Sequence, residues 1–182
     1  MSFKTDIQAR VDKQIESSFV VETGWGDPEA DKAASGCGFA HVPARGVLEV
    51  LILADTPMFF KGHYIDGRMR PCTRGTCKMC SDGKGTQKRW VFPVHDCGRG
   101  ATRLLELGEA PSGQLIRYAQ DYQGLLGLRF RFSKPGGTLR STIQIELTGL
   151  ARVPAGELPE CPDVLAVMTK IWTDQATKKL IS

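Results

Sequence analysis

Five short stretches of the chain are rich in aliphatic, β-branched and aromatic residues, and most of them alternate apolar with polar positions. They are residues 47–54, 88–94, 103–107, 128–132 and 142–147. In residues 88–94, for example, Trp90, Phe92 and Val94 share one face. Alternation with a period of two is typical of strands that bury one face. The middle of the chain is therefore predicted to be mainly β.

Helical periodicity is found at three places around these strands. Apolar residues recur at every fourth position over about residues 3–17, which predicts an amphipathic helix. Ser112 is a plausible N-cap for a second helix, which Gly124 ends. Its apolar face would consist of Leu115, Tyr118, Ala119 and Tyr122. Pro162 and Asp163 open a last helix, and its inward residues would be Leu165, Met168 and Trp172.

The order of these elements predicts a mainly β fold with flanking helices, of the α+β class. A short helix between the third and fourth strands of a small barrel is the arrangement expected of an OB-fold. We therefore expect an OB-fold-like five-stranded barrel over residues 46–150, with an inserted zinc-knuckle subdomain at residues 61–92. Residues 1–45 would form an N-terminal helix and loop appendage, and residues 151–182 a loop and helix packed on the core. A zinc-ribbon-containing α+β domain would give the same element order.

Three cysteines lie close together in the insertion. Cys72, Cys77 and Cys80 are spaced C-x4-C-x2-C, and His63 precedes the first by nine positions. Zn²⁺ prefers four nitrogen and sulfur ligands in a tetrahedron, and thiolates two residues apart can reach one ion across a tight turn. The alternative is a redox dithiol at Cys77 and Cys80, but the residues that follow offer neither a helix start nor a βαβ context. The spacing thus predicts a structural zinc ion.

Several residues could supply the fourth ligand. The favoured set is His63, Cys72, Cys77 and Cys80, with Cys97 and then His95 as alternatives to His63, because both follow the knuckle at the end of the next apolar run. A lone histidine is more often a surface or core residue, so the three nearby cysteines are what favour His63.

Composition is that of an ordinary globular protein. The 182 residues are 41% hydrophobic and 24% charged, with a net charge of +4. No apolar run reaches the length of a membrane span, and the N-terminus lacks the apolar region of a signal peptide. We therefore expect a cytoplasmic protein without membrane contact.

Basic residues are concentrated in the knuckle, where only Asp66 and Asp82 oppose them between His63 and Phe92. Aromatic residues flank the same segment. A basic groove with aromatic side chains suits a single-stranded nucleic acid, because cations meet phosphates and rings stack on bases. The candidate contacts are Phe60, Tyr64, Arg68, Arg70, Lys78, Lys88, Arg89, Trp90, Arg129, Arg131 and Lys134. Of the rings, Phe60 and Tyr64 are expected to be exposed, whereas Trp90 shares a face with Phe92 and fits a core position better.

The order of the histidine and the three cysteines, inside a basic and aromatic segment, resembles the zinc-containing single-stranded DNA-binding proteins of tailed phages and mobile elements. The closing half of the chain is similar as well, from residues 104–107 through Gly127–Gly137 to residues 142–145. This resemblance covers about residues 58–148. It implies an OB-fold, zinc on His63, Cys72, Cys77 and Cys80, and DNA contacts from the nearby basic and aromatic residues.

The function expected from these features is sequence-tolerant binding that coats and protects single-stranded DNA in replication or recombination, without catalysis. Self-association along the strand, or contact with replication and recombination proteins, would accompany it. RNA binding through the same surface and a zinc-stabilised protein-interaction subunit are the alternatives. A zinc hydrolase or deaminase is disfavoured, because the chain has neither H-E-x-x-H nor H-x-E paired with P-C-x-x-C.

Overall fold

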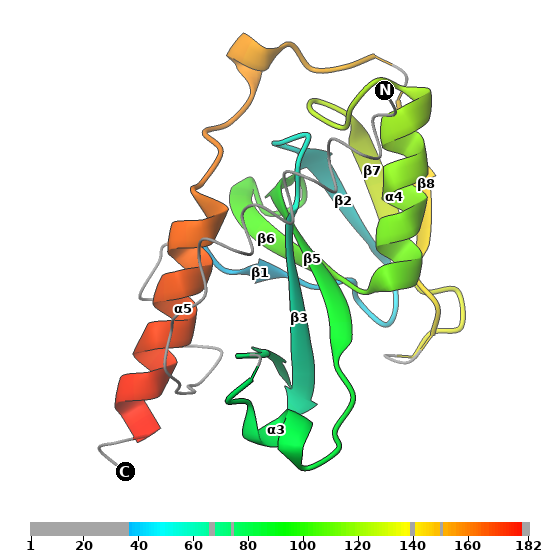
Figure 1. The fold of residues 1–182 in the computed structure, drawn as a ribbon. Helices are drawn as coiled ribbons and strands as arrows, with labels where there is room; N and C mark the ends of the chain where they lie inside the picture. Colours follow the sequence, from blue (N-terminus) through cyan, green and yellow to red (C-terminus); the bar gives the residue numbers. More distant parts are fainter. Residues whose placement is uncertain (1–36, 66–67, 74, 139–140, 150, 180–182) are drawn as a thin grey trace.

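The computed structural model describes residues 37–65, 68–73, 75–138, 141–149 and 151–179. Within them the chain forms a curled half-barrel sheet with a few helices around it (Figure 1). The elements in chain order are β1 (Phe39–Ala40), β2 (Val47–Ile52), β3 (Met58–Ile65), β4 (Arg68–Pro71), α3 (Lys78–Ser81), β5 (Gln87–Asp96), β6 (Ala101–Leu107), α4 (Glu109–Asp121), β7 (Arg129–Ser133), β8 (Gln144–Leu147), the 3-10 helix η1 (Ala155–Glu157) and α5 (Val164–Lys179).

Strand β5 organises the sheet because it is long enough to pair with three other strands. Its first half pairs with β3 and its second half with β2, while β6 pairs along the other edge, all antiparallel. The path continues from β2 to β7 and β8, and β1 adds to β6 in parallel. The first half of β5 thus carries β3 and β4 away from the rest of the sheet as a three-stranded ribbon (Figure 1).

The predicted strands are confirmed, and alternation explains the main core. Phe92, Phe130 and Phe132 are fully buried on the inner face of the sheet. Helix α4 covers this face with Leu115 and Ala119, and the Tyr118 ring packs edge-on against Phe130 at 5.2 Å. Trp90 also packs against this core, as its shared face with Phe92 predicts.

Helix α4 begins earlier than the sequence suggests. Its N-cap is Gly108, and Ser112 is a buried residue of the first turn rather than the cap. The predicted N-cap was wrong, because the helix already includes Pro111. A proline is tolerated in the first turn, where backbone N–H groups have no partner within the helix.

Helix α5 covers part of the outer face of the sheet. Its buried Met168, Ile171 and Trp172 pack in a second core cluster with Val91 and Leu104 of the sheet. The inward positions predicted for Met168 and Trp172 are therefore confirmed. The helix predicted over residues 3–17 lies outside the described residues. Among the helices that are described, none has the length and apolar character needed to cross a bilayer.

Candidate metal centre

The ribbon of β3, β4 and β5 ends next to α3, the short helix of the knuckle (Figure 1). Strand β4 approaches β3 so closely that Gly62 has no room for a side chain. A Cβ at this position would lie 2.4 Å from the carbonyl oxygen of Arg70. The ladder then continues to Cys72, whose N–H donates to the Lys61 carbonyl at 2.8 Å. Backbone pairing therefore sets where Cys72 lies relative to His63.

The four predicted ligands meet at this end of the ribbon. Each residue offers one donor atom, and the four atoms all lie within 4.8 Å of one another. The Nε2 atom of His63 is 3.3 Å from the Cys77 sulfur and 3.4 Å from the Cys80 sulfur, and the sulfurs of Cys72 and Cys80 are 3.4 Å apart. Tetrahedral zinc places two sulfurs about 3.8 Å apart and a sulfur and ring nitrogen about 3.6 Å apart. The donor set and its spacing fit a zinc ion.

His63 is oriented by a second contact. Its ring is buried, and Nδ1 lies 3.2 Å from the Gly85 carbonyl oxygen. In the tautomer with hydrogen on Nδ1, that N–H donates to Gly85 and leaves the lone pair of Nε2 directed at the three sulfurs. A carbonyl that holds the outer nitrogen of a ligand histidine is the usual support at zinc sites.

The thiols of Cys77 and Cys80 differ in pKa. Burial opposes ionisation of Cys77, but the backbone N–H groups of Cys80 and Met79, then the thiols of Cys72 and Cys80, lower its pKa to about 6. For Cys80 the contact with Cys72 comes first, followed by desolvation and Cys77, and its pKa rises to about 11. Cys77 thus ionises more readily than Cys80 in the absence of an ion. A bound cation would favour the thiolate form of the sulfurs that contact it.

The four residues of the favoured ligand set are clustered and could hold one metal ion, whereas the alternative ligands lie elsewhere. His95 and Cys97 lie at the opposite end of β5 from the ribbon, where the Cys97 N–H donates to the Glu49 carbonyl at 2.9 Å. With three thiolates and one imidazole, the cluster would form a closed four-ligand centre of the structural kind, which holds backbone in place rather than offering an open coordination position.

The predicted aromatic contacts fall in different environments. Tyr64 is 59% exposed, as expected. The expected exposure of Phe60 is wrong: it is 3% exposed and its ring meets Trp172 at 5.4 Å. The reason is the long-range packing of α5, which no local pattern reveals. Trp90 is half-buried and lies 4.9 Å from the Phe59 ring.

Several of the predicted basic contacts have carboxylate partners. Lys88 pairs with Glu109 at 2.8 Å, and Arg89 with Glu106 at 3.4 Å. These carboxylates come from outside the knuckle, so the low acidity of the knuckle did not reveal them.

The arginines of β7 are partly balanced as well. Arg129 and Arg131 both face Glu49, at 3.7 and 3.8 Å, and Arg131 also faces Glu146 at 3.7 Å. This sheet face is therefore less basic than its arginines suggest. Among the other candidates, Lys78 is exposed while Arg70 and Lys134 are half-buried. The side chain of Arg68 lies outside the described residues.

One exposed cation was missed in the sequence. Lys61 lies directly opposite Lys88 in the β3–β5 ladder, on the same face of β3 as His63. Side chains opposite one another in an antiparallel pair have Cβ atoms about 4.5–5.5 Å apart, so two like charges there are unfavourable. Treating residues 58–65 as a strand paired with residues 87–91 would have revealed the pair.

Comparisons of the chain with protein-family models, with curated proteins and with solved structures found no match.

Proposed function

We propose that this protein binds single-stranded DNA without sequence preference, and that a structural zinc ion on His63, Cys72, Cys77 and Cys80 holds one wall of the binding surface. Coating and protection of exposed strands during replication or recombination would be its role. The observation that carries the proposal is the exposed pair Lys61 and Lys88, which lie directly opposite each other on a ribbon with the metal centre at its end.

Two like charges directly opposite each other in a sheet destabilise the fold unless a negatively charged partner is present. Lys88 has Glu109 as its partner, whereas Lys61 has no ion pair within the described part of the chain. Exposed Lys78 and Lys84 lie near the metal centre, on either side of Cys80. The phosphates of a nucleic acid backbone would neutralise these lysines and release counterions. Counterion release is the main source of non-specific affinity for nucleic acids.

The fold supports the same location. We interpret β2, β5, β6, β7 and β8 as the five barrel strands of an OB-fold, since β2 pairs with β5 and β7, β5 with β6, and β7 with β8, with α4 between β6 and β7. OB-folds bind oligonucleotides through their second and third strands and through the loops L12 and L45. In this interpretation the metal ribbon is L12, and Lys134 follows β7 in L45.

Helix α5 affects which of these surfaces can be used. It covers Val91 of β5 and Leu104 of β6, which would be the binding face of strands two and three. We therefore assign the contacts with the DNA strand to the loops L12 and L45. The exposed Tyr64 side chain is available there for stacking on a base. Stacking of this kind contributes about 1–3 kcal/mol per base.

The test is a titration of fluorescent single-stranded and double-stranded oligomers at two salt concentrations, together with measurement of zinc content. We expect a preference for single strands and an affinity that falls steeply with salt. Lys61→Ala should weaken binding to all sequences alike and reduce the salt slope by about one. Competition with matched RNA would show which sugar is preferred.

A matched control is Arg117→Ala, which removes an exposed positive charge from α4, away from the ribbon. It should leave affinity nearly unchanged. Arg129→Ala combined with Arg131→Ala should have a smaller effect than Lys61→Ala, because Glu49 and Glu146 already balance those arginines. Binding that ignores salt, or equal losses in Lys61→Ala and Arg117→Ala, would contradict the proposal.

A further inference from the structure

Two sulfurs of the candidate metal centre lie close enough to form a covalent bond. The Sγ atoms of Cys72 and Cys80 are 3.4 Å apart, whereas a disulfide joins its sulfurs at about 2.05 Å. Cys80 is exposed and Cys72 is half-buried. Cys77 differs from them, because it is 8% exposed and its sulfur lies 3.3 Å from Nε2 of His63. The two more accessible sulfurs thus lie next to each other.

The backbone around these cysteines allows the sulfurs to approach further. Cys72 is fixed, because its N–H donates to the Lys61 carbonyl at 2.8 Å in continuation of the β3–β4 ladder. Cys80 belongs to α3, a helix of four residues none of which is buried. Segments with few buried contacts move at low cost in free energy. A shift of α3 toward β4 can therefore close the remaining gap of about 1.4 Å, the difference between 3.4 Å and a disulfide bond.

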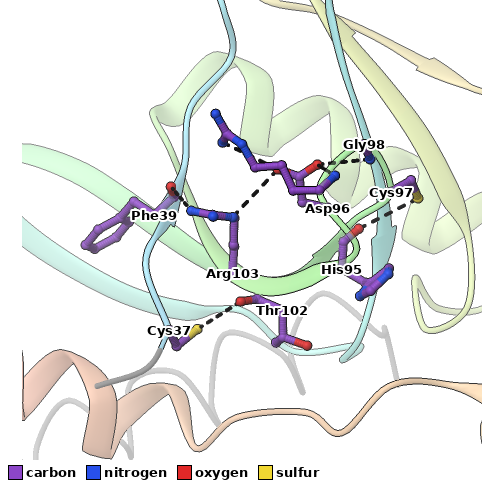
Figure 2. A network of polar contacts seen from close by, with 9 residues as sticks. Cys37, Phe39, His95, Asp96, Cys97, Gly98, Thr102 and Arg103 are labelled. Atoms are coloured by element: carbon purple, nitrogen blue, oxygen red, sulfur yellow. Dashed lines mark hydrogen bonds and ion pairs between the residues drawn. The ribbon is translucent and has the colours of Figure 1, made fainter. Parts of the chain in front are cut away.

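The cysteines outside the metal centre are poor competitors for an oxidant. Near the turn between β5 and β6, the Cys37 thiol donates to the Thr102 carbonyl at 3.6 Å and the Cys97 thiol to the His95 carbonyl at 3.8 Å (Figure 2). Burial raises the pKa of Cys37, Cys97 and Cys161. Peroxides react with thiolates, and a sulfur that binds a metal ion is a thiolate. Oxidation should therefore begin at the metal centre.

We propose that Cys72 and Cys80 form a redox switch, in which hydrogen peroxide joins their sulfurs in a disulfide and the metal ion is released. In the first step the Cys80 thiolate attacks one peroxide oxygen, the O–O bond breaks, and hydroxide leaves a sulfenic acid behind. In the second step the Cys72 thiolate attacks the Cys80 sulfur, the S–S bond forms, and the S–O bond breaks with loss of hydroxide. The two sulfurs supply the two electrons that reduce the peroxide, and both hydroxides take up protons to become water.

The disulfide would leave too few donors for the ion. Cys77 and His63 remain, whereas a structural zinc site needs four ligands. The consequence for strand binding rests on the proposed function. Lys78 and Lys84 are exposed and flank Cys80, so loss of the ion would loosen the segment that carries both charges. Oxidation should therefore weaken the binding of single strands about fivefold or more.

The experiment treats the zinc-loaded, full-length protein with hydrogen peroxide in the presence of a chromophoric chelator, and maps the disulfides by peptide mass spectrometry. We expect release of about one zinc ion per chain. Peptides joined through Cys72 and Cys80 should appear at the same rate, with a mass lower by two hydrogen atoms. A dithiol reductant and added zinc should restore the metal-bound protein, because thiol–disulfide exchange reverses the oxidation.

The matched control is Cys161→Ser, which removes the exposed thiol that lies outside the metal centre. It should release zinc and form the disulfide as the wild-type protein does. The redox switch is overturned if zinc stays bound under peroxide, or if zinc leaves while Cys72 and Cys80 remain unlinked. Pairing of Cys80 with Cys77 instead of Cys72 would overturn it as well.

A strand titration before and after oxidation separates this inference from the proposed function. If the reduced protein binds single strands and the oxidised protein binds them about fivefold more weakly, both are supported. If the reduced protein binds no strand while the disulfide forms and zinc leaves, the proposed function fails and the metal-release switch stands. If the reduced protein and the protein with the Cys72–Cys80 disulfide bind equally well, control of strand binding is refuted.

Discussion

Replacing Gly62 with alanine should weaken metal binding at the candidate centre without unfolding the sheet. The added Cβ would lie 2.4 Å from the carbonyl oxygen of Arg70 and 3.0 Å from its carbon. Contacts below 3.0 Å are essentially never found for a real Cβ, and ordinary contact begins at 3.4 Å. Strand β4 must therefore move away from β3 by about 0.6 to 1.0 Å, since both obstructing atoms belong to the backbone.

Such a displacement is large compared with what a zinc site tolerates. Ligand distances at metal sites hold to within about 0.2 Å. Cys72 follows Arg70 by two residues and is carried by the same ladder, so its sulfur would move relative to His63. Changes that misplace one ligand typically cost 10–100-fold in metal affinity, or about 1.4–2.7 kcal/mol. We expect a loss in this range for Gly62→Ala.

The assay is competition for zinc between the protein and a chromophoric chelator, with far-UV circular dichroism to monitor the fold. Gly85→Ala is the matched control, because Gly85 lies in the same centre, has nothing within 4 Å of an added Cβ, and keeps the carbonyl that faces His63. Equal zinc affinity in Gly62→Ala and the wild-type protein would refute this account of how the ribbon positions its ligands.

Three other outcomes follow from the structure. Cys80→Ser should reduce zinc content from about one ion per chain to near zero by elemental analysis, whereas Cys97→Ser should retain the ion. Gly127→Ala should lower the unfolding free energy in urea by at least about 3 kcal/mol, because φ is +76° and the Cβ would lie 2.4 Å from a backbone carbonyl oxygen. Burial raises the pKa of Glu106 above its ordinary 4.5, with Arg89 opposing the shift. Between pH 4.5 and the raised pKa, the folded state therefore binds more protons than the unfolded state. The free energy of unfolding should decrease as pH rises through the raised pKa, and Glu106→Gln should remove this decrease.

Most of the strands and the metal ligands could be predicted because their signals are local. Alternation identified the faces of β5 and β7, since a strand that buries one side must alternate. The cysteine spacing identified three candidate ligands, because thiolates a few residues apart can reach one ion across a turn. The start of α4 was missed because a proline in the first turn and a proline before a helix give similar local patterns.

The sequence by itself thus determined the inner face of the sheet and the three thiols of the centre, which depend on residues close together in the chain. The tertiary structure decided that His63 joins them, that Phe60 is buried under α5, and that Lys61 faces Lys88. These outcomes depend on strand register and helix docking between distant segments, and such pairings are selected by the packing of the whole fold rather than by any local pattern.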